Sequence, residues 1–146
     1  FGGAGETHTV FFMEQIIKKL NQKNLRPSIQ RIKILYYLEN KKNHPTVDCI
    51  YQDILPEIPN LSRTTVYNTL NVLLENDLVI QLDFGEGCLR YDADTTPHSH
   101  FFCRKCGKVF DLKISPEDIA SKIPTGFSVQ ETQLYAFGCC EKCSKT

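Results

Sequence analysis

Two pairs of cysteines in the C-terminal half of the chain have the spacing of metal ligands. Cys103 and Cys106 form one Cys-x-x-Cys pair, and Cys140 and Cys143 form the other. Each pair places two thiolates on one tight turn, and two such turns complete a tetrahedral four-thiolate shell for zinc. Because this shell leaves no coordination position open, we expect a structural zinc ion that ties the end of the chain to the middle of a second domain.

The cysteines as a group point to metal binding rather than to disulfides. Their number, seven, is odd, and no secretory signal is present in the sequence. Only Cys140, not its neighbour Cys139, keeps the two-residue spacing to Cys143. Cys49, Cys88 and Cys139 have no assigned partners, and we expect them to be small buried core residues. Whether they form part of an additional metal site stays open.

A second set of metal-binding side chains surrounds a His-x-His motif. His98 and His100 lie on the same side of an extended segment, which makes them a bidentate metal clip. Asp92 and Asp111 flank this clip in the sequence, and His44 lies far upstream before a proline. An isolated His-x-His motif can also consist of solvent-exposed polar residues that bind no metal.

The elements that position these residues begin with helices in the first half of the chain. One helix is predicted from Met13 and ends before Pro27, because proline cannot continue a helix. Ser28 and Thr46 are N-cap residues for two more helices. The apolar residues that recur at helical spacing are Ile16, Ile17 and Leu20 in the first, Ile29, Ile32, Ile34, Leu35 and Leu38 in the second, and Val47, Ile50, Ile54 and Leu55 in the third.

The helix predicted over residues 62–75 has one apolar face and one hydrogen-bonding face. Ser62 is its N-cap residue, and the apolar stripe consists of Val66, Leu70, Leu73 and Leu74. The opposite face carries donors and acceptors with little net charge, which suits the major groove of DNA. Its residues are Arg63, Thr64, Tyr67, Asn68 and Asn71.

Alternating residues around Gly85-Glu86-Gly87 predict a β-hairpin with arms at 78–84 and 88–91. Helices followed by a hairpin are the order of a winged helix-turn-helix, although helices and hairpins also occur together in folds that do not bind DNA. Beyond the hairpin, strands are predicted at 101–102, 108–112 and 127–134, and Ser115 opens a short helix. The fold class is therefore α+β.

The predicted domains follow these elements. Residues 1–12 have no clear period, and we interpret them, with His8, as a cloning-derived or disordered extension outside the functional chain. A winged-helix DNA-binding domain is expected over 13–92 and a hinge over 93–97. A small C-terminal α/β domain for dimerisation and metal binding is expected over 98–146.

Charge gives no support for a nucleic-acid partner. The 17 basic and 17 acidic residues balance, so DNA binding has to come from a local patch. The chain has no run of about 18 apolar residues that could span a membrane, and we expect a cytoplasmic protein without a membrane partner.

Taken together, the motifs resemble those of the ferric uptake regulator (Fur) family of bacterial repressors. The resemblance covers nearly everything from Met13 to Cys143, and implies a homodimer that binds double-stranded operator DNA through the helix Ser62 to Glu75, with Tyr67 as a contact. It also implies structural Zn(II) on the four cysteines. The matching residues are His44-Pro45-Thr46, Thr65-Val66-Tyr67, Arg90-Tyr91-Asp92, His98-Ser99-His100, Cys103 to Lys108, Asp111, and Phe137-Gly138 leading into Cys140 to Cys143.

Within that family the chain is most similar to the peroxide-sensing (PerR) branch. The resemblance implies a regulatory Fe(II) or Mn(II) site made of His44, Asp92, His98, His100 and Asp111. In iron-sensing members a glutamate commonly stands where Asp111 stands, so the aspartate favours peroxide sensing. The same resemblance implies that Fe(II) leads peroxide to oxidise His44 or His98, whereas Mn(II) does not.

A sensing role agrees with the charge of this ligand set. Two carboxylates and three neutral imidazoles carry about two negative charges, which a divalent cation cancels while linking His44 to ligands beyond the hinge. Metal should thus favour one inter-domain angle, and only one angle sets two recognition helices into major grooves roughly 34 Å apart.

Three alternatives remain for this sequence. An iron-availability repressor would bind and release its metal reversibly. A non-haem iron or zinc enzyme would use the open position of a His-rich site for catalysis, but we expect no enzyme because no further acid–base group or phosphate loop is visible. A zinc-ribbon interaction module without DNA binding leaves the polar face of residues 63–71 unexplained.

Overall fold

The chain forms two compact units, which meet between Thr95 and Thr96, inside the segment 93–97 predicted as a hinge. The computed structural model describes residues 3–145, with side chains from residue 9 onward. Residues 1, 2 and 146 and the side chain of His8, on which parts of the domain predictions fall, lie outside the described residues.

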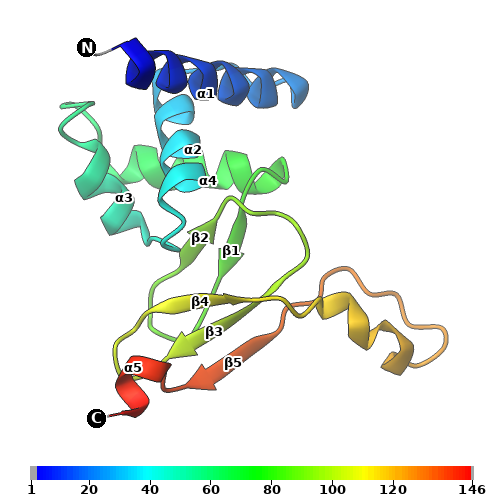
Figure 1. Ribbon diagram of the computed structural model, residues 1–146. Helices are drawn as coiled ribbons and strands as arrows, with labels where there is room; N and C mark the ends of the chain where they lie inside the picture. The colour runs from blue at the N-terminus through cyan, green and yellow to red at the C-terminus, as the bar shows by residue number, and fades with distance from the viewer. Residues whose placement is uncertain (1–2, 146) are drawn as a thin grey trace. The chain divides into compact units, whose positions relative to one another are not determined.

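The first unit consists of helices followed by a hairpin (Figure 1). The elements are α1 (Gly3–Gln22), α2 (Ile29–Lys41), α3 (Val47–Ile54), α4 (Arg63–Glu75), β1 (Ile80–Leu82) and β2 (Arg90–Asp92). The three predicted N-caps are confirmed: the side chains of Ser28, Thr46 and Ser62 accept hydrogen bonds from the N–H groups of Arg31, Cys49 and Thr65. This order of elements is that of a winged helix-turn-helix.

Helix α1 begins at Gly3, ten residues before the predicted start at Met13. Ile16 and Leu20 are fully buried, whereas Val10 and Phe11 are exposed. Among the side chains described in this helix, from residue 9 onward, packing anchors the C-terminal part. Once that part is formed, each further residue adds one backbone hydrogen bond without a new nucleation cost, so the helix extends into a stretch that has no apolar period.

The core of the first unit is built mainly from the helical stripes that the sequence predicts, although Ile29, which is predicted to lie in the stripe of α2, is 57% exposed. Val66, Leu70 and Leu73 of α4 are fully buried, and Leu74 packs at the edge of the same cluster. The remaining fully buried members include Ile34 and Leu35 of α2, Ile50 of α3, and Tyr91 of β2.

The predicted hairpin is present and is tied to the loop before α3. β1 and β2 pair antiparallel, with Gln81 opposite Tyr91, and Gly85 and Gly87 in the turn have φ values of 79° and 83°, which glycine adopts without strain. On its other edge β2 reaches residues 45 and 46: Thr46 bridges Arg90, and the N–H of Tyr91 donates to the carbonyl oxygen of Pro45 at 3.0 Å.

The second unit is a three-stranded sheet with short helical segments (Figure 1). Its elements are β3 (Ser99–Cys103), β4 (Val109–Leu112), the 3-10 helix η1 (Pro116–Lys122), β5 (Tyr135–Gly138) and α5 (Glu141–Ser144). β3 is the central strand, antiparallel to β4 and parallel to β5.

The strand predicted over 127–134 is wrong, because the last strand is instead β5 at Tyr135–Gly138. Phe127 and Val129 alternate as strand residues do, but both are exposed. The parallel ladder places Gly138 beside Cys103, and the N–H of Arg104 donates to the carbonyl oxygen of Gly138 at 2.7 Å. This pairing brings the second cysteine pair next to the first.

Among residues 3–145, no helix is both long enough and apolar enough to cross a membrane.

Candidate metal and DNA-binding sites

The four predicted zinc ligands lie together in the second unit. The Sγ atoms of Cys103, Cys106, Cys140 and Cys143 all lie within 4.8 Å of one another, and those of Cys106 and Cys140 are 3.9 Å apart. In a tetrahedral zinc site with Zn–S bonds of about 2.3 Å, the sulfur atoms are about 3.8 Å apart. The observed cluster therefore fits a four-thiolate zinc site.

Backbone geometry prepares one sulfur of this cluster for ligation. Cys103 ends strand β3, and its Sγ accepts hydrogen bonds from the N–H groups of Cys106 at 3.5 Å and Cys140 at 3.3 Å. Gly107 has a φ of 75°, and its N–H closes the turn onto the carbonyl oxygen of Cys103 at 2.8 Å. The turn is thus shaped by the backbone and not by the metal alone.

The thiols of the cluster differ in their pKa values. Hydrogen bonds from the N–H groups of Cys106 and Cys140 lower the pKa of Cys103 to about 6. Hydrogen bonding with the neighbouring thiol of Cys140 raises the pKa of Cys143 to about 12. One thiolate forms readily in this cluster, and further ones repel it, so four thiolates require the positive charge of a metal.

The other three cysteines correct the prediction made for them. Cys49, Cys88 and Cys139 are exposed rather than buried. Cys49 is in the first turn of α3, and Cys88 precedes β2. Their side chains therefore add nothing to the cores.

Two of the predicted regulatory ligands lie in the first unit. Nε2 of His44 is 3.3 Å from Oδ2 of Asp92, and the side chains are 5% and 9% exposed. The other carboxylate oxygen of Asp92 accepts a hydrogen bond from the N–H of Asp94 at 2.8 Å. A buried imidazole and carboxylate at this separation form half of a metal site or a simple hydrogen-bonded pair.

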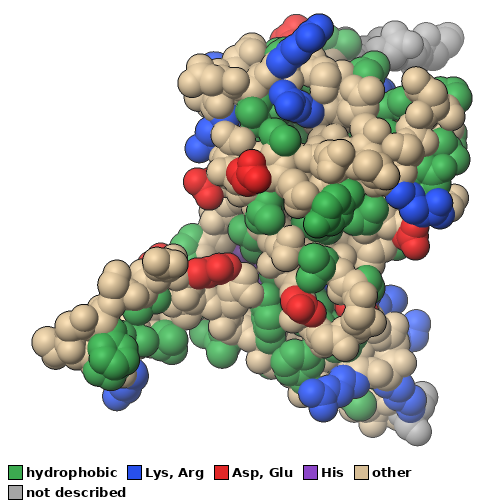
Figure 2. All heavy atoms as spheres, turned by 180° about the vertical axis from the view of Figure 1, so that it is seen from behind, with side chains coloured by type: hydrophobic (Ala, Val, Ile, Leu, Met, Phe, Trp, Pro, Cys, Tyr) green, Lys and Arg blue, Asp and Glu red, His purple; other side chains and the backbone are tan. Residues whose placement is uncertain are grey.

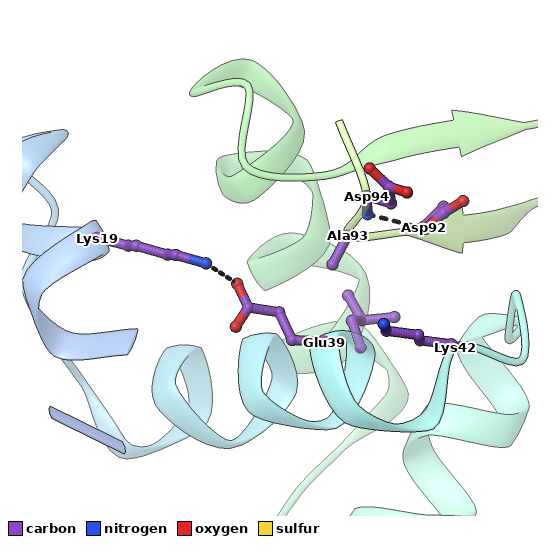
Figure 3. A pocket seen from close by; sticks show the side chains of 7 residues that line it. Lys19, Glu39, Lys42, Asp92, Ala93 and Asp94 are labelled. Atoms are coloured by element: carbon purple, nitrogen blue, oxygen red, sulfur yellow. Dashed lines mark hydrogen bonds and ion pairs between the residues drawn. The ribbon is translucent and has the colours of Figure 1, made fainter. Parts of the chain in front are cut away.

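Asp92 also lines a shallow pocket of the first unit (Figure 3). The pocket has a volume of about 380 Å³, and Nζ of Lys19 bridges its edge to Oε1 of Glu39 at 2.5 Å. Its wall carries charges of both signs, since Lys42 and Asp94 also line it.

The remaining three predicted ligands meet in the second unit. Oδ1 of Asp111 is 3.4 Å from Nε2 of His98 and 3.6 Å from Nε2 of His100. The ladder between β3 and β4 pairs His100 with Asp111, and the two imidazole centres are 4.4 Å apart. One carboxylate oxygen of Asp111 thus lies within 3.6 Å of the Nε2 atoms of both imidazoles.

A backbone contact fixes the orientation of one of these imidazoles. Nδ1 of His98 is 2.7 Å from the carbonyl oxygen of Thr96. Because a carbonyl oxygen only accepts, the proton belongs on Nδ1, and the lone pair of Nε2 faces Asp111. This arrangement suits an imidazole that binds a divalent cation through Nε2.

Helix α4 presents the polar face that the sequence predicts. Arg63, Thr64, Tyr67 and Asn68 are exposed and Asn71 is half-buried, while Tyr67 keeps 49% of its surface accessible. This face is free of the apolar residues that would indicate a packing surface within the unit.

Two residues that no pattern in the sequence indicates contact the start of this helix. Nε of Arg63 lies 2.5 Å from Oδ1 of Asp48, and the guanidinium lies 4.4 Å from the ring centre of Tyr51. The carboxylate of Asp48 raises the pKa of Arg63. Both partners are on α3, and no spacing in the sequence indicates that they meet Arg63.

Comparisons with known proteins show which family the chain belongs to. The model of the ferric uptake regulator family matches residues 22–137. The chain is 37% identical over 137 residues to the peroxide operon regulator of Bacillus subtilis, covering 91% of this chain and 94% of that protein. It is 34% identical over 136 residues to the peroxide-responsive repressor PerR of Staphylococcus epidermidis, covering 91% of each.

Solved structures show the same relationship. PerR from Streptococcus pyogenes has a TM-score of 0.52 at 30% identity, covering 90% of this chain and 92% of its own. The ferric uptake regulator of Helicobacter pylori has a TM-score of 0.72 at 22% identity, covering 92% and 93%, which shows a shared fold. On the family match and the identity to the Bacillus relative, this chain belongs to the ferric uptake regulator family.

Proposed function

We propose that this protein is a metal-dependent transcriptional repressor that senses peroxide. The observation that carries the proposal is the position of Asp111 in the second unit, where its carboxylate oxygen lies 3.4 Å from Nε2 of His98 and 3.6 Å from Nε2 of His100. Relatives of nearly the same length are a peroxide operon regulator and peroxide-responsive repressors. We infer binding of a signal and of DNA rather than substrate turnover, in the cytoplasm where that DNA lies.

The regulatory metal would be shared between the units. His44 and Asp92 would supply two ligands from the DNA-binding unit, and His98, His100 and Asp111 would supply three from the other. Nitrogen and oxygen donors of this kind suit Fe(II) and Mn(II). A shared ion would favour one arrangement of the two units, and so one spacing of two recognition helices.

The chain's own residues would set the response to peroxide. When bound, Fe(II) supplies the electrons that reduce peroxide and so oxidise a neighbouring imidazole, whereas Mn(II) does not readily do so. His44 and His98 are the candidate targets. Oxidation of either imidazole would remove a lone pair needed for ligation, and the arrangement that binds DNA would be lost.

The DNA-reading surface would be the exposed face of α4. Arg63 and Tyr67 would reach phosphates or base edges, together with Thr64, Asn68 and Asn71. The wing formed by β1, β2 and their turn would lie beside the same duplex.

A second copy of the chain would cover the apolar surface of the second unit, giving a homodimer. Large apolar side chains gather there on η1 and the loop after it (Figure 2), and a short unit with this much exposed apolar surface favours a partner. The exposed residues are Phe110, Ile114, Ile119, Phe127, Val129, Leu134 and Phe137.

The deciding experiment compares operator binding by the zinc-loaded protein with Mn(II) and with Fe(II), before and after a brief pulse of peroxide. The proposal would be established if only the iron form lost DNA binding and mass spectrometry detected one added oxygen on His44 or His98. Binding that follows iron reversibly and ignores peroxide would instead make the protein an iron-availability repressor. Steady consumption of a substrate without any DNA binding would make it an enzyme.

A further inference from the structure

Arg90 joins the turn of the hairpin to the backbone of His44. Its Nε and Nη2 donate to Oε2 and Oε1 of Glu86 at 2.8 and 2.9 Å, and its Nη1 donates to the carbonyl oxygen of His44 at 3.2 Å. A bidentate pair of this kind fixes the plane of the guanidinium. The side chains of Arg90 and Glu86 are only 17% and 21% exposed, so water screens the pair less than a surface pair.

His44 has a backbone conformation that needs external support. Its φ is 50°, in the left-handed region that non-glycine residues rarely adopt. The following residue is Pro45, whose ring pushes the preceding residue toward extended backbone instead. Such a conformation persists only where surrounding contacts hold it, and the hydrogen bond from Arg90 is made directly to the His44 carbonyl.

Strand β2 supplies the other contacts to the same segment. Thr46 bridges Arg90, and the N–H of Tyr91 donates to Pro45. Asp92, which lies 3.3 Å from the His44 imidazole, follows two residues later on the same strand. Both members of the His44–Asp92 pair are therefore positioned by β2, and Arg90 is the side chain that connects them to the hairpin turn.

We propose that Arg90 is a positioning residue for the regulatory metal. Because it donates hydrogen bonds both to Glu86 and to the carbonyl oxygen of His44, it orients the His44 imidazole and couples that ligand to the wing. The inference rests on the proposed function, in which His44 and Asp92 bind the metal. Coupling of two sites is reciprocal. A metal that fixes His44 will therefore also restrain the turn at residues 83–89, and disturbing that turn will weaken metal binding.

The test measures Mn(II) binding to the zinc-loaded full chain by calorimetry, without DNA. Partners that orient a metal ligand typically contribute about 10- to 100-fold to affinity, so Arg90→Ala should weaken Mn(II) binding by at least about tenfold. Arg90→Lys should give an intermediate loss, because an ammonium cannot reproduce the bidentate pair. Glu86→Gln should lower the Mn(II) affinity only a few-fold, because its neutral amide still accepts one hydrogen bond.

Arg31→Ala is the matched control, since Arg31 donates to the carbonyl oxygen of Arg26 on the surface of the same unit. This variant should bind Mn(II) as the parent protein does.

A second readout separates positioning from general destabilisation. The visible absorption of bound Co(II) reports the geometry of its ligands, and it should change in Arg90→Ala and recover in part in Arg90→Lys. If Arg90→Ala does not fold, the Lys and Gln variants decide, and unchanged affinity and absorption in both would overturn the inference. So would parent-like Mn(II) affinity in a folded Arg90→Ala. A parent protein that binds no Mn(II) beyond its zinc would overturn the proposed function, and this inference with it.

Discussion

Arg63, the first residue of helix α4, is paired with Asp48 of the preceding helix at a distance of 2.5 Å between Nε and Oδ1. The side chains are 57% and 71% exposed, so the pair adds little to stability. Its effect is on the position of the guanidinium, which the ring of Tyr51 also contacts. A phosphate or a base edge that approaches Arg63 must compete with a carboxylate already in place.

Removing this competition should increase the affinity for DNA and reduce the specificity for the operator sequence. We expect Asp48→Asn to raise affinity for random-sequence DNA a few-fold at low salt, because one negative charge leaves the DNA-facing surface. The preference for operator over random DNA should fall, because the guanidinium is no longer oriented. Fluorescence anisotropy on both DNAs at several salt concentrations measures these effects.

The control for that variant removes the same charge elsewhere on the unit. Glu57 is exposed and its Oε1 lies 3.5 Å from Nζ of Lys33. Glu57→Gln changes net charge equally without touching Arg63. Equal gains in the two variants would show that net charge, and not the position of Arg63, determines the effect.

The cysteines should fall into two classes of reactivity. In zinc-loaded protein an alkylating reagent should label Cys49, Cys88 and Cys139 quickly, because all three are exposed, and should spare the four clustered thiols. Chelation should release those four to the reagent and lower the thermal stability of the second unit, since a structural zinc site contributes folding free energy directly. Mass spectrometry of the labelled peptides counts each class.

Two neighbouring serine variants sharpen this test. Cys139→Ser should keep one bound zinc ion per chain, whereas Cys140→Ser should lose it, because only Cys140 lies in the cluster. Zinc retained by Cys140→Ser but lost by Cys139→Ser would reverse the assignment of the ligand.

The features that could be predicted from the sequence depend on interactions between residues close together in the chain or on the fixed geometry of a metal site. Ser62 caps α4 and Val66 is buried as the apolar stripe requires, because capping and periodicity act within a few residues. The convergence of the four cysteines could be predicted in the same way, since zinc geometry dictates ligand spacing.

The failures involve contacts between distant residues. The stretch 127–134 alternates like a strand, but β5 forms at 135–138, where its parallel pairing with β3 places Gly138 beside Cys103. The contacts of Arg63 with Asp48 and of Arg90 with His44 join residues 15 and 46 positions apart. No local pattern indicates such pairs, since tertiary packing alone decides them.

Tyr37 should make stability fall at high pH. Burial, and then the hydrogen bond its hydroxyl donates to Asp53 at 2.6 Å, raise its pKa from 10.0 to about 12. Between these values the folded state keeps a proton that the unfolded state has lost. The stabilisation is therefore complete below pH about 10 and is lost as pH rises toward about 12.

Urea unfolding between pH about 9 and about 12 tests this linkage. The decline in unfolding free energy should be shallower in Tyr37→Phe, which has no phenol to titrate. Asp53→Asn should keep most of the decline, because burial is the larger cause of the shift. A decline as steep in Tyr37→Phe as in the parent protein would assign it to other groups.

Asp111 should affect metal affinity far more than folding. Its carboxylate faces His98 and His100 at 3.4 and 3.6 Å, yet the side chain is 51% exposed. Asp111→Asn keeps the size of the side chain and removes one of the negative charges that attract a divalent cation. We expect Mn(II) affinity to fall at least about tenfold, with the melting temperature of the metal-free protein nearly unchanged.

Asp118→Asn, on the exposed helix η1, is the charge-matched control and should bind Mn(II) normally. An equal loss in both variants would mean that long-range charge attracts the ion, and a loss in neither would remove Asp111 from the regulatory site.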